Sequence, residues 1–277
     1  MRNLDPKTVA GFGDEWSEYD QTGAAEGELE HFFDVYFSVF PWESLPQGAV
    51  GFDLGCGSGR WARLVAPRVG KLHCIDASEK ALEVARRNLA GSDRCEFHCA
   101  SVDSIPLPDA SMDFGYSLGV LHHVPDSEAG IRSCVAKLKE GAPFLLYLYY
   151  RFDNRPAWYR SLWGASELLR AVISRLPHAA KVPVTRAIAG TVYFPLARSS
   201  ALLEKAGVNV AGVPLSAYRA SSFYTMATDA LDRFGTRLEK RFTAAEIRGM
   251  MERAGLVDIR FSEGEPFWCA VGFRRSS

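Results

Sequence analysis

The chain has 277 residues, and at about 150 residues per domain this length suggests one or two domains. Its 47% hydrophobic and 23% charged residues are typical of a globular protein, which excludes disorder, collagen and coiled coil as overall descriptions. The formal net charge of −1 lacks the basic excess of a dedicated nucleic-acid binder, so binding to nucleic acid is not expected.

The first residues lack the apolar core of a signal peptide, and no apolar run approaches the roughly 18 residues that span a bilayer. The six cysteines form no C-x-x-C pair, which favours reduced thiols in a cytoplasmic protein without a membrane span. Cys95, His98 and Cys99 are close enough to suggest a metal, but no second pair has zinc spacing. We therefore expect ordinary strand residues there and no metal.

Strand and helix patterns alternate through the first 150 residues. Apolar residues recur at helical spacing over 28–40, and Pro41 ends that helix. The segments that follow are, in chain order, strand 49–54, strand 71–76, helix 78–89, strand 95–100, strand 112–118, helix 127–138 and strand 143–150. This alternation predicts βαβ units and a parallel sheet with helices on both faces.

The alternation stops after residue 150. An amphipathic helix is expected over 157–176, after which Pro183, Pro195 and Pro214 should interrupt a mainly helical segment. Regular signals return with the capping box at 243–246, a helix ending at Gly255, and two strands over 257–262 and 266–273.

We therefore predict three parts of the chain. Residues 1–150 form an N-terminal lid and a cofactor-binding core, residues 151–242 a helical substrate-binding insertion, and residues 243–277 the last helix and a closing β-hairpin. Residues 1–50 carry a net charge of −8 and residues 151–200 one of +6. Two solvated faces explain this polarity, and so would two segments that face each other across a cleft or bind an anionic group.

The stretch from Asp53 to Gly59 reads D-x-G-x-G-x-G and joins a strand to a helix. Glycines there let the backbone approach a ligand closely. A dinucleotide site would need a third glycine where Arg60 stands. Asp53 instead suits a cationic amine such as that of S-adenosylmethionine, and Asp76 ends the next strand, where an acid binds ribose hydroxyls.

On these residues, and on the stretches 100–108 and 112–124, the chain resembles the class I S-adenosylmethionine-dependent methyltransferases that act on small molecules. The resemblance implies a Rossmann-like, seven-stranded, mostly parallel α/β sheet whose last two strands are antiparallel, with the helical insertion after the fifth strand. It implies S-adenosylmethionine as cofactor and S-adenosylhomocysteine as product. The cofactor-binding residues that it implies are Asp53, Gly55, Cys56, Gly57, Gly59, Asp76, Ala77, Ser101, Val102 and Leu118.

The sequence departs from that family where an Asp often stands, because Ser101 takes its place. The Ser101 hydroxyl or the Asp103 carboxylate would then contact the exocyclic amine of the adenine. The Asn/Asp-Pro-Pro-aromatic loop of enzymes that methylate base or amide nitrogens is absent from residues 118–121.

Candidate catalytic groups follow the fourth and fifth strands. His123, or else His122, would act as a general base, although both could simply pack or cap a helix. Tyr149, Tyr150 and, in the insertion, Trp158 are candidates for acceptor binding, with ordinary burial as the alternative. Trp16 and Tyr19 would form a lid over the cofactor or a plain helix face.

These features favour a methyltransferase that acts by direct displacement on an oxygen, nitrogen or carbon of a small metabolite. Two alternatives remain: methylation of RNA or protein through the basic insertion, and a cofactor-binding domain that has lost catalysis. The acceptor and the oligomeric state do not follow from the sequence.

Overall fold

The computed structural model describes residues 3–23, 25 and 27–276, and the chain forms two compact units. The first unit holds Glu30–Arg151 with the flanking segments up to Asp20 and from Leu238 onward. The second unit holds Gln21–Leu29 and Phe152–Arg237. Assigning substrate selection to the insertion stays a prediction.

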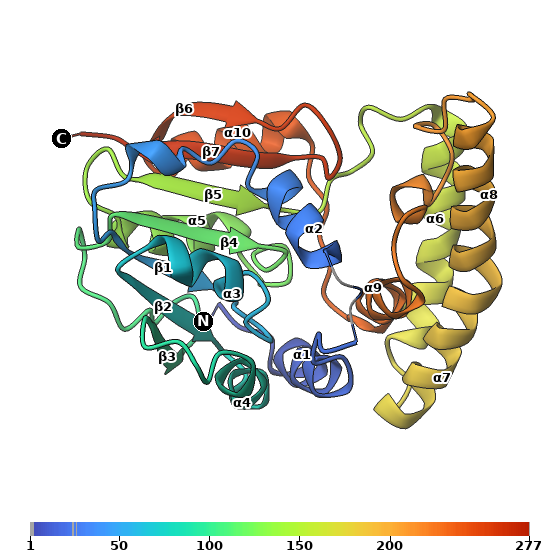
Figure 1. Cartoon of the computed structure of the whole chain (residues 1–277), viewed down its shortest axis with the longest axis horizontal. Helices are drawn as coiled ribbons and strands as arrows, with labels where there is room; N and C mark the ends of the chain where they lie inside the picture. The colour runs from blue at the N-terminus through green and yellow to red at the C-terminus, as the bar shows by residue number, and fades with distance from the viewer. Residues whose placement is uncertain (1–2, 24, 26, 277) are drawn as a thin grey trace. The chain divides into compact units, whose positions relative to one another are not determined.

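A seven-stranded sheet forms the centre of the first unit (Figure 1). Its strands are β1 Val50–Leu54, β2 Lys71–Asp76, β3 Cys95–Cys99, β4 Phe114–Leu118, β5 Pro143–Tyr147, β6 Leu256–Phe261 and β7 Cys269–Arg274. They lie in the order β3-β2-β1-β4-β5-β7-β6. The first five strands are parallel, while β7 is antiparallel to both β5 and β6. This confirms the predicted seven-stranded, mostly parallel sheet with its antiparallel last pair.

Helices cover both faces of this sheet. The first unit contains α1 Pro6–Glu18, most of α2 Glu28–Tyr36, α3 Ala62–Val65, α4 Glu79–Asn88, α5 Ser127–Lys137 and α10 Ala244–Arg253. Phe52, Leu54 and Phe144 of the sheet share one buried core with Ile131 of α5 and Met251 of α10. In contrast, α3 and α4 pack along β2 and β3. Burial on both faces explains why the central strands β1, β4 and β5 are almost continuously apolar.

Some elements are shorter than the sequence predicts. The strand expected over 143–150 ends at Tyr147, which is the last residue paired with β7, and Tyr150 forms only a single bridge to Phe242. The helix expected over 28–40 ends at Tyr36. From there to Pro41 the backbone forms turns in which an N–H donates to the carbonyl three residues earlier. The strand therefore ends where its pairing with β7 ends, and the helix ends where its hydrogen bonds leave the α-helical pattern.

The second unit is largely helical, with α6 Ala157–Ile173, α7 His178–Ile188, a π-helical turn Ala189–Tyr193, α8 Phe194–Lys205 and α9 Phe223–Gly235. The expectation that Pro183 and Pro195 break the helix is wrong. Pro183 lies inside α7, where the neighbouring backbone bonds hold the helix despite one missing N–H, and Pro195 lies in the first turn of α8, where that N–H is not needed.

The capping box of α10 forms as predicted. Thr243 Oγ1 accepts a hydrogen bond from Glu246 N at 3.2 Å, and Glu246 Oε2 accepts one from Thr243 N at 2.8 Å. We expect Thr243→Ala to lower the stability of the first unit by about 1 kcal/mol, because the helix N-terminus loses one of its acceptors. Thermal unfolding checks this, with Thr243→Ser as the control, since its hydroxyl keeps the cap; an unchanged melting temperature in the alanine variant would contradict the assignment.

Candidate functional site

The glycine-rich loop after β1 is shaped by residues with positive φ. Gly55 and Gly57 adopt φ values of +79° and +53°. A side chain at Gly57 would also collide with the indole of Trp16, because its Cβ would lie 2.8 Å from that ring. The Trp16 ring of α1 therefore contacts the loop, and this contact requires glycine at position 57.

Two predicted acids lie at the carboxyl ends of β1 and β2, beside the loop. Asp53 is 1% exposed, and its Oδ2 has no hydrogen-bond partner among the described residues. Burial raises the pKa of Asp53 to about 8; the nearby Tyr116 hydroxyl opposes this rise, the charge of Asp76 adds to it, and the charge of Arg60 opposes it. Asp53 is therefore a buried acid with an acceptor oxygen to offer.

Asp76 holds the loop through its carboxylate. Its Oδ2 accepts a hydrogen bond from Gly57 N at 3.0 Å, and its Oδ1 accepts one from Ser78 N at 2.8 Å. Burial raises the pKa of Asp76, and these two backbone donors oppose the rise. The structure thus brings both predicted acids and the glycine loop to one edge of the sheet, as the carboxyl ends of parallel strands require.

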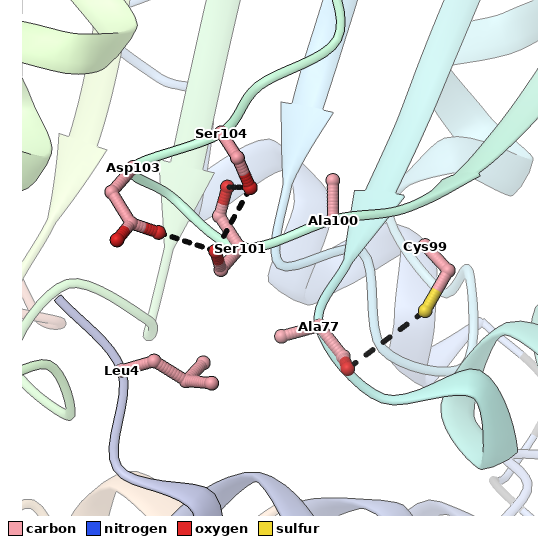
Figure 2. Close-up of a pocket in the computed structure, with 7 residues that line it drawn as sticks. All are labelled: Leu4, Ala77, Cys99, Ala100, Ser101, Asp103 and Ser104. Carbon is pink, nitrogen blue, oxygen red and sulfur yellow. Dashed lines mark hydrogen bonds between the residues drawn. The ribbon is translucent and has the colours of Figure 1, made fainter. Parts of the chain in front are cut away.

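A pocket of about 290 Å³ opens beside Asp76, at the ends of β2 and β3 (Figure 2). The residues lining it are Leu4, Ala77, Cys99, Ala100, Ser101, Asp103 and Ser104. The Ser101 hydroxyl donates to Asp103 Oδ1, and Asp103 Oδ2 accepts from Asn3 N at 3.0 Å. Ala77 and Ser101 were predicted here. Cys99, Ala100 and Ser104 could have been found from the end of β3, whereas nothing in the sequence singles out Leu4.

The remaining predicted cofactor residues are buried around this edge. Cys56 and Leu118 are 3% and 6% exposed, and Gly59 adopts a φ of +79°. Val102 belongs to the main apolar core, where it packs with residues of the sheet and α5. Contact between these residues and a cofactor stays a prediction.

The two adjacent histidines follow β4 and differ in their surroundings. His123 Nδ1 lies 2.6 Å from Leu238 O. Because a carbonyl only accepts, Nδ1 carries the hydrogen, and in the neutral ring Nε2 is the nitrogen that can take a proton. The ring also packs against Phe12 of α1, with centroids 4.8 Å apart.

His122 is fully buried, and neither of its ring nitrogens has a hydrogen-bond partner among the described residues. Burial holds the pKa of His122 well below its usual range, and the neighbouring His123 and Arg241 act in the same direction. His122 is therefore neutral, and its ring lies against Tyr149 with centroids 3.8 Å apart.

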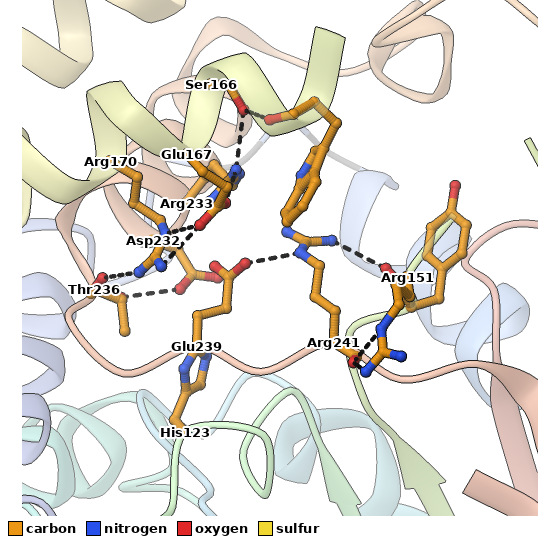
Figure 3. Close-up of polar contacts among 12 residues, drawn as sticks. His123, Arg151, Ser166, Glu167, Arg170, Asp232, Arg233, Thr236, Glu239 and Arg241 are labelled. Atoms are coloured by element: carbon orange, nitrogen blue, oxygen red, sulfur yellow. Dashed lines mark hydrogen bonds and ion pairs between the residues drawn. The ribbon is translucent and has the colours of Figure 1, made fainter. Parts of the chain in front are cut away.

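Tyr149 also lies under a buried cation. The guanidinium of Arg241 is 5.0 Å from the centre of the Tyr149 ring. It also forms an ion pair with Glu239 at 2.8 Å (Figure 3). Burial opposes the charge of Arg241, but Glu239 raises its pKa, so it stays charged. Arg241 also donates to Tyr150 O at 3.3 Å. No motif in the sequence marks Arg241 or Glu239.

Trp158 belongs to the second unit, where its ring is 55% exposed. Its part in acceptor binding stays a prediction.

Within the second unit, Glu167 accepts from both Arg170 and Arg233 (Figure 3). The positive charge of the insertion is therefore partly neutralised by its own carboxylate. Among the described residues, no helix has the length and apolar character to cross a membrane.

The sequence is similar to known methyltransferases over the region that forms the first five strands. Residues 52–146 match the methyltransferase domain family. The chain is 27% identical over 174 residues to the ubiquinone biosynthesis O-methyltransferase of Idiomarina loihiensis, covering 61% of this chain and 70% of that one. It is 31% identical over 128 residues to the Bordetella avium protein of the same name, which covers 45% of this chain and 52% of that relative. The chain thus spans about half the length of some curated relatives.

Solved structures share the fold at low identity. A "possible histamine N-methyltransferase" of Thermotoga maritima superposes with a TM-score of 0.52 at 14% identity, covering 97% of this chain and all of that one. The S-adenosylmethionine-dependent methyltransferase SibL gives 0.54 at 14% identity, covering 89% and 55%. Together, the sheet order, the glycine loop and the domain matched over residues 52–146 support a class I S-adenosylmethionine-dependent methyltransferase.

Proposed function

We propose that this protein transfers the methyl group of S-adenosylmethionine to a hydroxyl oxygen of a small molecule. The observation that carries the proposal is the joint position of Asp53, Asp76 and the histidine pair at the carboxyl edge of the sheet. The name O-methyltransferase of the two relatives supports an oxygen acceptor. Nitrogen and carbon acceptors remain outcomes of the test.

The residues present fit this cofactor. Asp53 offers a buried carboxylate oxygen that makes no hydrogen bond within the described part of the chain, which suits the ammonium of the methionine part. Asp76 stands where ribose hydroxyls bind, and the pocket beyond it is lined by Ala77, Ser101 and Asp103, which suits the adenine. The hydrogen-bonded pair Ser101–Asp103 supplies oxygen acceptors for the exocyclic amine, in place of the single Asp that relatives often have.

The sulfonium supplies an already activated methyl group, so the chain itself has three tasks: to align the acceptor, exclude water and take one proton. We assign the proton to His123. Its Nδ1 hydrogen is held by Leu238 O, which fixes the tautomer and leaves Nε2 to accept the hydroxyl proton as the carbon–oxygen bond forms. Tyr149 and Tyr150 follow β5, the strand that pairs with β4, so they lie at the same edge of the sheet as the histidines. This position suits contacts to the acceptor.

A small acceptor is favoured over a polymer because several basic side chains of the insertion are already engaged in hydrogen bonds. Arg155, Arg170, Arg175, Lys181 and Arg198 all donate hydrogen bonds to carbonyls or carboxylates within the second unit. A phosphate backbone would have to compete with these bonds.

The experiment that tests the function uses S-adenosylmethionine labelled in its methyl group. The enzyme is incubated with low-mass phenols, alcohols and amines and, separately, with cell extract, and the label is followed by molecular size. Label in a low-mass ether is expected. Label only in RNA or protein would overturn the acceptor class, and cofactor binding without any transfer would overturn the activity.

The buried acid predicts how cofactor affinity depends on pH. A cation bound beside Asp53 favours the carboxylate, so binding releases the proton that Asp53 holds below a pKa of about 8. Affinity for S-adenosylhomocysteine should therefore rise from pH 5 to pH 7, by at most about tenfold per pH unit, the limit for one proton. Calorimetry measures this, and Asp53→Asn should flatten the profile. A flat wild-type profile would remove Asp53 from the ammonium site.

A further inference from the structure

A second group of polar side chains lies on β2 and β3, apart from the residues proposed to bind cofactor and acceptor. It consists of His73, Glu96 and His98, whose ligand atoms all lie within 4.8 Å of one another. The parallel pairing of the two strands creates it, because His73 lies opposite Glu96 and Ile75 lies opposite His98. Paired neighbours point to the same face of a sheet, so the three side chains share one face.

Successive residues of a strand point to opposite faces of the sheet, and this separates the side chain of His98 from those of the neighbouring cysteines. Phe97 faces α4, where the Arg86 guanidinium lies 5.8 Å from its ring, and Cys95 and Cys99 share the side of Phe97. Figure 2 shows the Cys99 thiol directed toward the carbonyl of Ala77. The grouping of Cys95, His98 and Cys99 that the sequence suggested is therefore divided between two faces, and His98 meets His73 instead.

The distances fit a small divalent ion. His73 Nδ1 and His98 Nε2 are 3.0 Å apart, His73 Nδ1 is 3.8 Å from Glu96 Oε2, and His98 Nε2 is 3.6 Å from Glu96 Oε1. Tetrahedral zinc with bonds of about 2.0–2.1 Å places neighbouring ligand atoms about 3.3 Å apart. Each imidazole nitrogen thus lies within about half an ångström of this spacing from one oxygen of Glu96, and rotation of the exposed carboxylate would bring a single oxygen toward both.

The burial and charge of the group also suit an ion. The side chains of His73 and His98 are 11% and 19% exposed, while that of Glu96 is 46% exposed and leaves a route from solvent. Lys71 donates to Glu96 Oε2 at 2.7 Å, and this ion pair competes with a metal ion for the carboxylate.

We propose that His73, Glu96 and His98 form a binding site for Zn²⁺, with solvent completing the coordination, that joins the edge strand β3 to β2. Two imidazoles and one carboxylate are a ligand set that zinc takes in proteins. Without the ion, the two imidazoles share one hydrogen between Nδ1 and Nε2. When the ion binds, both of these nitrogens must present a lone pair to it, so the ring that donated the hydrogen carries it on its outer nitrogen instead.

The test is calorimetric titration of the tag-free, metal-stripped full chain with Zn²⁺, with visible absorption of bound Co²⁺ as a second measure. We expect one ion per chain and a higher melting temperature when zinc is present, because the ion binds the folded state. Loss of a residue that merely supports a ligand costs about 10–100-fold in affinity, so Glu96→Gln and His98→Gln should each cost at least that.

Two further variants separate the site from other causes. Cys95→Ser with Cys99→Ser should leave zinc binding unchanged, because those thiols lie on the other face. Lys71→Gln should tighten binding, because it removes a cation 2.7 Å from the carboxylate, whereas general damage to the fold would weaken it. Circular dichroism shows that each variant folds. Absence of saturable binding at one ion per chain, or binding that depends on the cysteines and not on His98, would overturn the proposal.

Discussion

Replacement of His123 by glutamine is expected to lower the rate of methyl transfer by about 10²–10⁴-fold, the usual contribution of a general base. The carbonyl of Leu238 holds Nδ1 of His123 at 2.6 Å and so presents the other nitrogen as the proton acceptor. Glutamine keeps a similar volume but cannot take the proton. Single-turnover measurements with labelled cofactor report the chemical step separately from product release.

Two observations distinguish a base from a packing residue at this position. For a phenolic acceptor, the deficit of His123→Gln should shrink as the pH approaches about 10, where the acceptor ionises without help. A residue that only supports the fold would give a deficit that does not depend on pH. His122→Gln is the companion variant, since His122 is buried and neutral. If His122→Gln carries the larger, pH-dependent loss, the roles of the two histidines are exchanged.

We expect Asp76→Ala to weaken the binding of S-adenosylhomocysteine by about 1–3 kcal/mol, which is the loss of a charge-assisted hydrogen bond. This corresponds to about 5–150-fold in affinity. The carboxylate also accepts from Gly57 N and Ser78 N, so the variant loosens the glycine loop as well. Calorimetric titration measures the affinity, and an unchanged value would exclude Asp76 from the cofactor site.

The effect on the loop can be separated from the direct contact. Asp76→Asn keeps one oxygen acceptor and removes the negative charge, so its affinity should fall between those of wild type and Asp76→Ala. Ser78→Ala provides a second comparison, because it removes the side chain that caps α4 through Ala81 N at 3.4 Å and leaves Asp76 in place. It should lower thermal stability with little change in affinity. Equal losses of affinity in Ser78→Ala and Asp76→Ala would mean that loop order alone explains the effect.

The strands of the sheet and the glycine loop could be predicted because their signals are local. Residues 50–54 are a short apolar run followed at once by the glycines, and both the strand and the positive φ values of Gly55 and Gly57 follow from that order. The positions at which helices and strands end were predicted less accurately. Whether β5 stops at Tyr147 or continues to Tyr150 depends on the reach of β7, which no local pattern contains.

The interpretations of Pro183 and Pro195 as helix breaks were wrong for a related reason. Neither proline has an N–H to donate, yet α7 continues through Pro183 and α8 begins with Pro195 in its first turn. A single missing N–H costs little where neighbouring turns remain bonded or where the first turn has no partner for it. Propensity is a weak guide when a helix has neighbours to pack against.

By itself, the sequence determined the class of the fold, the order of its elements and the two acids at the ends of β1 and β2, because these depend on periodicity and on residues next to each other in the chain. Only the tertiary structure decided which distant side chains meet. It brought Trp16 onto Gly57, Arg241 and Glu239 to Tyr149, and His73 to His98. Strand register and helix packing set these contacts, and a shift of one residue would turn each strand's side chains to the opposite face.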